Sequence, residues 1–236
     1  MELGFIKDMF NSIAPRYDFL NRLLSLRRDV YWRREMIKAL WTPQNGIILD
    51  AACGTGDVMI ELLKQKPQLH QVMGIDFAPE MLKLARKKIN SFEAFGKTRL
   101  IAGNSLALPF STGSFDAITI AFGIRNIMDR KAALQEFFHH LKPGGSLAVL
   151  ELATPTQPIL KFLYLAYFKK ILPGIGGFFA SNAKAYRYLP ASVIRFPEPG
   201  AFAALMQSAG FQQIRWYRLT MGLCTLHIGI KPGNKY

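Results

Sequence analysis

Along the middle of the chain, hydrophobic and polar positions alternate between two patterns. From Ile47 onward, short compact apolar runs are followed by stretches with apolar residues at helical spacing. The compact runs predict strands over 47–51, 71–76, 99–103, 115–121 and 146–152. The stretches between them predict helices over 58–65, 79–89 and 130–141, and the sequence Lys-Pro-Gly-Gly at 142–145 predicts a turn.

The C-terminal part has a different pattern. A helix predicted over 199–209 is followed by strands predicted over 213–219 and 224–230, joined by a short link that contains Met221 and Gly222. So short a link predicts an antiparallel pair. Strands that alternate with helices predict a parallel sheet with right-handed crossovers. The combination indicates an α/β fold: the seven-stranded Rossmann-like sheet of class I S-adenosylmethionine-dependent methyltransferases, with an antiparallel terminal strand.

Two segments lie outside this pattern. Residues 1–45 have helical patterning and clusters of aromatic and basic residues, and residues 153–198 separate the fifth strand from the next helix. We therefore expect residues 46–236 to form a methyltransferase domain with a helical insertion at about 153–198. Residues 1–45 are expected to form a helical cap over the substrate and cofactor.

The composition narrows the classes of partner. Half of the 236 residues are apolar, which excludes a disordered chain. The net charge of +14 indicates an anionic partner, such as a nucleic acid, a membrane surface or an acidic substrate, unless it reflects only a basic surface.

Other features of the sequence bear on whether the protein binds a metal and on where in the cell it is located. The cysteines Cys53 and Cys224 are too few for a zinc site, and His139 and His140 do not share a helix face, so no metal site is expected. The N-terminus lacks a signal-peptide pattern, and no apolar stretch reaches the roughly 18–20 residues of a membrane span. We expect a cytoplasmic protein, at most peripheral on the cytoplasmic face of the membrane.

A glycine-rich turn, Leu-Asp-Ala-Ala-Cys-Gly-Thr-Gly-Asp at 49–57, follows the first strand. The dinucleotide fingerprint needs a third glycine where Met59 stands, and no Lys-Ser or Lys-Thr completes a phosphate loop. The main-chain N–H groups around Gly54 and Gly56 suit a small anionic group such as the carboxylate of S-adenosylmethionine. Asp50, just before the turn, is placed to face the ammonium group of that ligand.

Polar residues also follow the next strands. Asp76 ends the second strand, where a carboxylate can accept hydrogen bonds from ribose hydroxyls. Phe77 and Met81 are placed to flank an adenine, and Asn104 and Ser105 to contact its edge. Together with the glycine turn, these residues predict a methyl-donor site.

Several motifs give a more specific indication: FNSIAPRYDFLNRLLSL, FGIRN, LKPGGSLAVLELATP, AYRYLPASV and GLCTLHIGIKP. Nearly the whole chain resembles the quinone C-methyltransferases of the UbiE/COQ5 family. The resemblance implies S-adenosylmethionine-dependent methylation of a ring carbon of a prenylated quinol, demethylmenaquinol first and a ubiquinone precursor second. It also implies cofactor contacts at Thr55, Asp76, Asn104, Ser105 and Ala121. Some members have Ser in place of Ala121, so only a backbone contact is expected there.

The reaction itself needs alignment and charge stabilisation. Alignment in a dry pocket can supply roughly 7–11 kcal/mol, and a cation that favours the quinol phenolate makes the ring carbon more nucleophilic. Arg125 in FGIRN is the best candidate for this cation, Asn126 for a group that orients the same oxygen, and Tyr17 for a lid over the methyl donor. The alternative for Arg125 is an ion pair that stabilises a loop. Strand-end carboxylates such as Glu151 and Asp116 can serve as caps or as partners of nearby arginines.

The insertion includes an aromatic-rich stretch at 155–179, in which Phe162–Phe168 is apolar on every face. Such a helix is usually buried against the core or a second copy of the chain, but it also suits the wall of a prenyl-tail tunnel or a membrane surface. The basic clusters at 27–34 and 86–88 fit an anionic membrane. The expected partners are thus a prenylated quinol, an anionic membrane and a homodimer.

Three alternative functions share some of these sequence features. An RNA or DNA amino-methyltransferase usually has an Asn-Pro-Pro-aromatic tetrad after the fourth strand, and none occurs here, so no nucleic-acid partner is expected. A non-enzymatic scaffold is disfavoured by the intact glycine turn with Asp76. A methyltransferase for another phenolic or lipid acceptor stays open.

Overall fold

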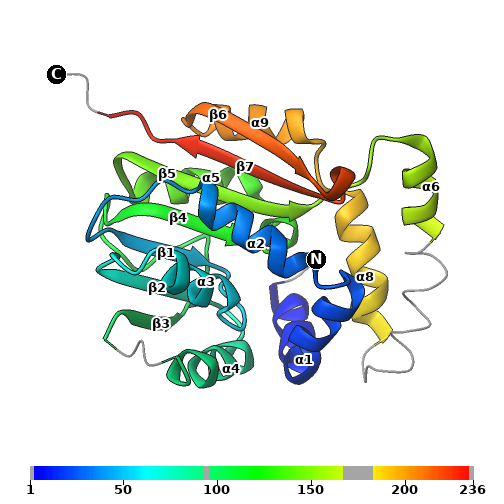
Figure 1. The fold of residues 1–236 in the computed structure, drawn as a ribbon, viewed down its shortest axis with the longest axis horizontal. Coiled ribbons are helices and arrows are strands. Elements are labelled where there is room, and N and C mark those ends of the chain that lie inside the picture. The colour runs from blue at the N-terminus through cyan, green and yellow to red at the C-terminus, as the bar shows by residue number, and fades with distance from the viewer. Residues whose placement is uncertain (1–2, 93–95, 167–182, 234–236) are drawn as a thin grey trace.

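A seven-stranded sheet forms the centre of the molecule (Figure 1). The computed structural model describes residues 3–92, 96–166 and 183–233. The strands are β1 (Ile47–Ala51), β2 (Gln71–Asp76), β3 (Thr98–Ala102), β4 (Phe115–Ala121), β5 (Leu141–Leu152), β6 (Gln212–Leu219) and β7 (Cys224–Ile230). They lie in the order β3-β2-β1-β4-β5-β7-β6, and β7 is antiparallel to both of its neighbours. The predicted fold class is confirmed.

Helices cover both faces of this sheet and its carboxyl edge. They are α1 (Leu3–Leu24), α2 (Arg28–Ala39), α3 (Asp57–Gln65), α4 (Pro79–Asn90), α5 (Arg130–His140), α6 (Pro158–Ala166), α8 (Ala183–Ile194) and α9 (Pro199–Ser208). Two short 3₁₀ helices follow strands: η1 (Ile124–Asn126) after β4 and η3 (Thr220–Gly222) after β6. Where the sequence predicted elements of the sheet domain, most observed ends differ by no more than one residue.

Strand periodicity divides the core into two layers. On β1, Leu49 packs into one apolar cluster together with Phe137 of α5 and Phe202 of α9. Its neighbour Ile48 packs into the other cluster, with residues such as Met36 of α2. Successive side chains of a strand point to opposite faces, and a strand covered on both faces is therefore apolar throughout. For this reason the central strands could be predicted from compact apolar runs in the sequence.

The predicted turn at 142–145 is wrong, because this segment lies inside β5. Leu141 pairs with Phe115 and Ser146 with Ala117, so the four residues between them form a bulge. The backbone of the bulge finds partners beyond the end of β7: the N–H of Gly144 donates to the carbonyl of Lys231 at 2.9 Å, and the N–H of Lys231 donates to the carbonyl of Gly145 at 2.8 Å. A neighbouring strand distant in sequence thus keeps the segment in the sheet.

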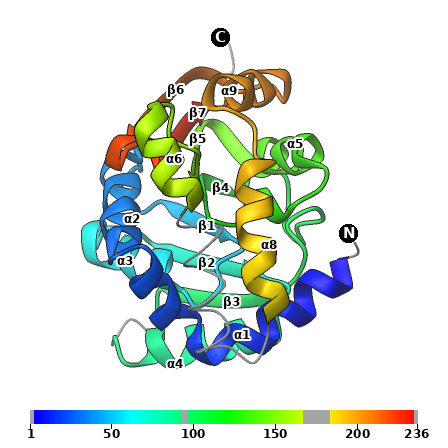
Figure 2. The ribbon, with the colours of Figure 1, turned by 90° about the vertical axis from the view of Figure 1, so that its right-hand side faces the viewer.

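Helices α1, α6 and α8 lie together beyond the edge at which the parallel strands end (Figures 1 and 2). Met9 and Leu20 of α1 form an apolar cluster with Val193 of α8. Helix α2 instead crosses one face of the sheet, towards α3. The segments outside the predicted sheet pattern thus contain helices α1, α2, α6 and α8, and α1, α6 and α8 cover the edge at which ligands of such folds bind.

Helix α6 is not buried as a whole. Phe162 is 71% exposed and Ile159 is 79% exposed, whereas Leu160 lines a cavity. The rest of the predicted helix, from residue 167, lies outside the described residues. In the described part of the chain, no helix is long and apolar enough to cross a membrane.

Candidate functional site

A cavity of about 240 Å³ lies where β1, β2 and β4 end. Its walls include six of the residues predicted to bind a cofactor: Gly54, Asp76, Phe77, Asn104, Ser105 and Ala121. Met81 of α4 also lines it. The topology brings these residues together, because the carboxyl ends of neighbouring parallel strands meet at one edge of the sheet.

The glycine turn and Asp76 hold each other in place. The N–H of Gly54 donates to one carboxylate oxygen of Asp76 at 2.8 Å, and the N–H of Ala78 donates to the other at 2.9 Å. Burial raises the pKa of Asp76, although the hydrogen bonds from these donors lower it in part. Gly54 has a φ of +53°, and a Cβ there would meet no atom within 4 Å, so the space beside the turn is open to a ligand.

Asp50 is buried just before the turn with half of its hydrogen-bonding capacity unused. Its Oδ1 accepts a hydrogen bond from the Thr119 hydroxyl at 2.8 Å, while its buried Oδ2 has no partner. Burial raises the pKa of Asp50 to about 8. Asp50 is not among the residues lining either cavity, but it is a carboxyl group that a nearby cation would stabilise in its ionised form.

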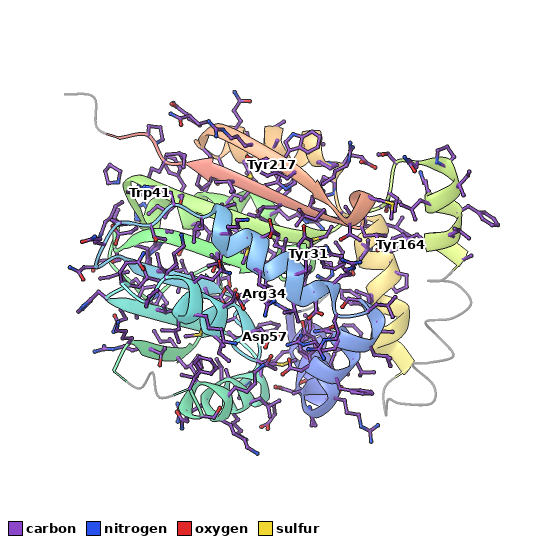
Figure 3. All side chains as sticks on the ribbon, in the orientation of Figure 1. Tyr31, Arg34, Trp41, Asp57, Tyr164 and Tyr217 are labelled. Carbon is purple, nitrogen blue, oxygen red and sulfur yellow. The ribbon has the colours of Figure 1, made fainter. Side chains whose placement is uncertain are left out.

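Asp57 lies at the start of α3 (Figure 3), and a cluster of charges surrounds it. Lys88 lies 2.5 Å from its carboxylate, Arg22 lies 2.7 Å away and Arg33 lies 3.4 Å away. Burial alone would raise the pKa of Asp57, but these cations lower it to about 2. Nothing in the sequence spacing of Asp57 links it to α1, α2 and α4, so this cluster was not predicted.

The side chain of Thr55 connects the glycine turn to α1. Its hydroxyl donates to Asp18 Oδ1 at 2.6 Å and accepts from Lys88 Nζ at 3.1 Å. Lys88 also pairs with the other oxygen of Asp18 at 2.7 Å. Gly56 starts α3 and faces Ala85 of α4. Thr55 and Gly56 therefore lie outside the lining of the small cavity, unlike the six residues above.

These contacts show that some residues of the two basic clusters form ion pairs within the protein. Lys88, from the cluster at 86–88, and Arg33, from the cluster at 27–34, pair with acidic residues inside the protein. Arg27, Arg28 and Arg34 remain exposed. Only part of each cluster is thus available to an external anionic surface.

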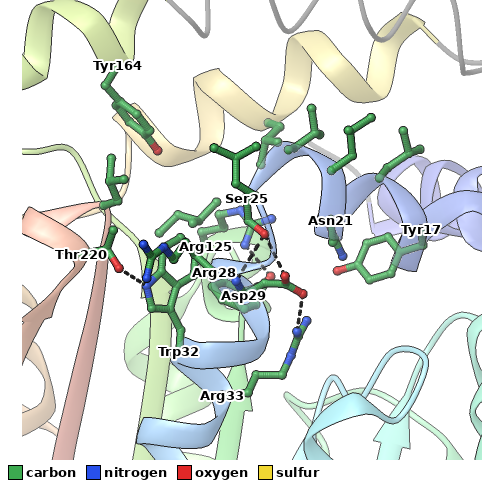
Figure 4. Close-up of a pocket in the computed structure, with 18 of the residues that line it drawn as sticks. Tyr17, Asn21, Ser25, Arg28, Asp29, Trp32, Arg33, Arg125, Tyr164 and Thr220 are labelled. Atoms are coloured by element: carbon green, nitrogen blue, oxygen red, sulfur yellow. Dashed lines mark hydrogen bonds and ion pairs between the residues drawn. The ribbon is translucent and has the colours of Figure 1, made fainter.

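A second cavity of about 590 Å³ adjoins the first (Figure 4). Its walls are mostly apolar and come from α1, α2, α6, α8 and η3. Helix α6 contributes Leu160, Leu163 and Tyr164, so one side of the insertion faces this space while Ile159 and Phe162 face outward. The cavity is large enough for an aromatic ring with an apolar substituent.

Three aromatic residues, Phe10, Tyr17 and Phe122, line both cavities. The rings of Phe10 and Tyr17 meet edge to face with centroids 6.1 Å apart. Phe122, held at a φ of +58°, contacts the Trp32 ring at 6.1 Å, and the Arg33 guanidinium lies over it at 5.3 Å. A ligand in one cavity would therefore lie next to a ligand in the other.

Arg125 is both an ion-pair partner and a wall residue of the large cavity. Its Nη1 donates to Glu151 Oε1 at 2.7 Å and to the carbonyl of Phe122 at 2.5 Å, while its buried Nε has no partner. Burial would lower the pKa of Arg125, but the charge of Glu151 raises it above its ordinary value. The predicted loop-stabilising pair thus exists, and it fixes a cation at the cavity.

The other two predicted catalytic residues, Asn126 and Tyr17, lie near Arg125. Asn126 lines the small cavity, and its Oδ1 accepts a hydrogen bond from the Tyr188 hydroxyl at 3.0 Å. Burial raises the pKa values of Tyr17 and Tyr188, against the effect of Arg125. Both tyrosines therefore stay protonated near neutral pH and can donate hydrogen bonds.

Sequence reasoning missed Phe10, Asp18 and Lys88. Phe10 and Tyr17 are seven residues apart, which is two helical turns, so their shared face was a usable signal. Nothing in the sequence linked Asp18 and Lys88 to each other. Among the described residues, no group of three or more His, Cys, Asp or Glu side chains is gathered to hold a metal.

Comparisons with known proteins identify the family of the chain. The model of the ubiE/COQ5 methyltransferase family matches residues 2–231. The chain is 47% identical over 226 residues to the ubiquinone/menaquinone biosynthesis C-methyltransferase UbiE of Geobacter sp. strain M21, covering 96% of each chain. It is 46% identical over 225 residues to the demethylmenaquinone methyltransferase of Thermus thermophilus, covering 95% of this chain and 100% of that one.

Among solved structures, a SAM-dependent methyltransferase from Thermotoga maritima has the same fold, with a TM-score of 0.67 and 20% sequence identity. The match covers 95% of this chain and 99% of that chain.

Asp57 and Asp50 should affect stability in opposite directions. The lowered pKa of Asp57 contributes about 2 kcal/mol above its unfolded-state pKa of 3.8, and this is lost as the pH falls towards 2. For Asp50 the raised pKa means that stability falls as the pH rises from about 4 to 8. We expect Asp57→Asn to lower and Asp50→Asn to raise the free energy of unfolding at pH 8, measured by urea denaturation. Shifts of the same sign would contradict this account.

Proposed function

The chain belongs to the ubiE/COQ5 methyltransferase family, and on that basis we propose that it methylates a ring carbon of a prenylated quinol with S-adenosylmethionine as methyl donor. Demethylmenaquinol is the favoured acceptor, and a demethylated ubiquinol precursor is the second. The observation that supports this most strongly is the pair of adjoining cavities that share Phe10, Tyr17 and Phe122. Both are mostly apolar, and the walls of the smaller one also include polar residues at strand ends.

The small cavity suits the methyl donor. Asp76 is held by two backbone N–H groups and can accept hydrogen bonds from ribose hydroxyls. Phe77 and Met81 offer apolar surface to an adenine, while Asn104 and Ser105 lie where its edge would be contacted. The cavity therefore offers a carboxylate to the ribose and both apolar and polar side chains to the adenine.

The glycine turn and Asp50 suit the methionine end of S-adenosylmethionine. The open space beside Gly54 leaves room for backbone N–H groups to meet a carboxylate. The unpartnered Oδ2 of Asp50 is the natural complement of an ammonium group. In this proposal Thr55, Gly56 and Ala121 act through their main chains, since the Thr55 hydroxyl is engaged by Asp18 and Lys88.

When bound, S-adenosylmethionine supplies an electrophilic methyl group. The protein's part is to place the quinol ring against it and to favour the ring's phenolate form. Arg125 is held by Glu151 and still has a free Nε–H, so it can stabilise the phenolate oxygen. Tyr17 lines both cavities and Asn126 lines the small one, and both side chains can donate hydrogen bonds to the same oxygen.

The proposed function gives the segments outside the sheet domain a role in covering the cavities. Helix α1 lines both cavities, and α2, α6 and α8 line the large one, so residues 1–45 and the described helices of the insertion act as a cap. Closing this cap around the ring excludes water from the reaction. A prenyl tail implies contact with a membrane, and a homodimer through the aromatic-rich insertion is a further hypothesis.

A methyl-transfer assay tests the proposed function. With methyl-labelled S-adenosylmethionine, we expect label in reduced demethylmenaquinol, with slower or no labelling of the oxidised quinone because it has no phenol to ionise. A demethylated ubiquinol precursor of matched tail length is the comparison acceptor. Binding of the cofactor without labelling of either quinol would refute the acceptor and leave the methyltransferase fold in place.

Asp76→Ala should weaken S-adenosylmethionine binding by about ten-fold or more, because the ribose loses a charge-assisted hydrogen bond worth roughly 1.5–3 kcal/mol. Calorimetric titration measures this, with Trp41→Ser as an exposed control far from either cavity. Asp50→Asn should also weaken binding, and it should remove the gain in affinity expected between pH 6 and 8 as Asp50 ionises. An unchanged affinity in both variants would place the cofactor elsewhere.

Arg125→Ala should lower kcat by about a hundred-fold, the usual effect of removing one oxyanion-stabilising donor, with little change in cofactor affinity. The rate should then recover as the pH rises, because the quinol ionises without help. Glu151→Gln should lower kcat less and show the same pH recovery, since it releases Arg125 from its position. Equal kcat and pH profiles in wild type and Arg125→Ala would leave Arg125 with only its structural role.

A further inference from the structure

Three segments border the large cavity: the turn between α1 and α2, helix α6 and the short helix η3. Each presents apolar side chains to solvent. Leu26 is 83% exposed, Ile159 79%, Phe162 71% and Met221 71%. We call these four residues the rim surface. In Figure 2 the three segments lie on the same side of the molecule, so the apolar side chains gather around one cavity rather than being scattered.

Two of these side chains stand on strained turns. Leu26 and Arg27 have φ values of +49° and +61°, and Thr220 and Met221 have values of +48° and +55°. Residues other than glycine rarely adopt this conformation and do so only where the surroundings enforce it. The Trp32 ring N–H donates to the Thr220 hydroxyl at 2.8 Å, which fixes η3 against α2. The exposure of Leu26 and Met221 is thus built into rigid turns.

The rim surface is surrounded by positive charge. Segments 20–28, 156–166 and 218–223 contain no Asp or Glu, and no acidic residue occurs between Glu151 and Glu198. Four basic residues of these segments are exposed: Arg27, Arg28, Lys161 and Arg218. Exposed apolar side chains with a basic border are typical of proteins that insert into the interface of an anionic bilayer.

We propose that the rim surface inserts into the headgroup region of an anionic membrane, so that the large cavity opens directly to the lipid. This inference rests on the proposed function, because a prenylated substrate resides in the bilayer. The four apolar side chains would enter the interface while the basic side chains reach the phosphate groups. The quinol ring then reaches Arg125 while its tail leaves between α6 and the α1–α2 turn, without passing through water.

The charge pattern favours a lipid surface over a second copy of the chain. A twofold interface would bring the basic borders of two copies together, and their repulsion opposes association. An anionic leaflet instead attracts them. Since none of the described helices can span a bilayer, the contact is interfacial, and the rim surface is the part that reaches deepest.

Co-sedimentation with vesicles tests the proposal. We use the full-length triple variant Ile159→Ser/Phe162→Ser/Met221→Asn, whose positions do not line either cavity; asparagine tolerates the left-handed conformation at 221. Trp41→Ser is the matched control, since Trp41 is 61% exposed and lies at the far end of the molecule (Figure 3). The vesicles are phosphatidylcholine, with and without phosphatidylglycerol.

Wild type and Trp41→Ser should bind the phosphatidylglycerol vesicles, less so at high salt, and the triple variant should bind at least about ten-fold more weakly. Equal binding by the triple variant and wild type, or no binding by wild type, would overturn the proposal. So would a wild-type dimer in sedimentation velocity that the triple variant abolishes while vesicle binding stays unchanged, since the rim surface would then join two copies.

Activity separates this inference from the proposed function. The triple variant should methylate a short-tailed, water-soluble quinol at the wild-type rate and lose at least about ten-fold in rate on a long-tailed quinol in vesicles. A loss on both acceptors would contradict the inference, because the rim surface would then act within the site. If wild type methylates neither quinol, the proposed function fails, whereas vesicle binding still reports on the rim surface.

Discussion

The cluster of charges around Asp57 connects the parts of the molecule on which the site depends. Arg22 comes from α1, Arg33 from α2 and Lys88 from α4, and all three meet the carboxylate at the start of α3. Such a partly buried cluster is stabilising only when every charge is paired, and in this protein the lowered pKa of Asp57 shows that the cations prevail over its burial. The cluster thereby docks the N-terminal helices onto the glycine turn.

The docking of α1 positions the residues between the two cavities. Asp18 receives both Lys88 and the Thr55 hydroxyl, and its neighbour Tyr17 lines both cavities. Helix α1 therefore cannot move away from the glycine turn without opening both sites at once. This arrangement suits a transfer between two bound molecules, because one rigid element completes the walls around both of them.

Asp50 and Asp57 are carboxylates with different roles: in the proposed function one meets a ligand, and the other stabilises the fold. The carboxylate of Asp57 is fully paired and stabilises the protein. Asp50, seven residues earlier, keeps a buried oxygen without a partner and a pKa of about 8. An unsatisfied buried group lowers stability and is retained where a ligand completes it. The cation that Asp50 lacks is what the ammonium group of the proposed methyl donor would provide.

The sequence by itself determined the sheet and one edge of the site. Strands buried on both faces are predominantly apolar rather than alternating, so 71–76, 115–121 and 224–230 were predicted with the bounds observed. The order of strands and helices then placed Asp76 and Asn104 at one edge, and both line the small cavity. These features depend on local pattern and on general rules of topology, which a single chain displays directly.

Only the tertiary structure decided which distant residues meet. Lys88 belonged to a basic run in the sequence, yet it turns inward because Asp18 and Asp57 lie within reach. The bulge at 142–145 stays in the sheet because Lys231 supplies its hydrogen bonds, and Phe162 is exposed because α6 covers a cavity with only one side. Each outcome depends on a partner far away in the chain, whose position becomes defined only when the whole fold has formed.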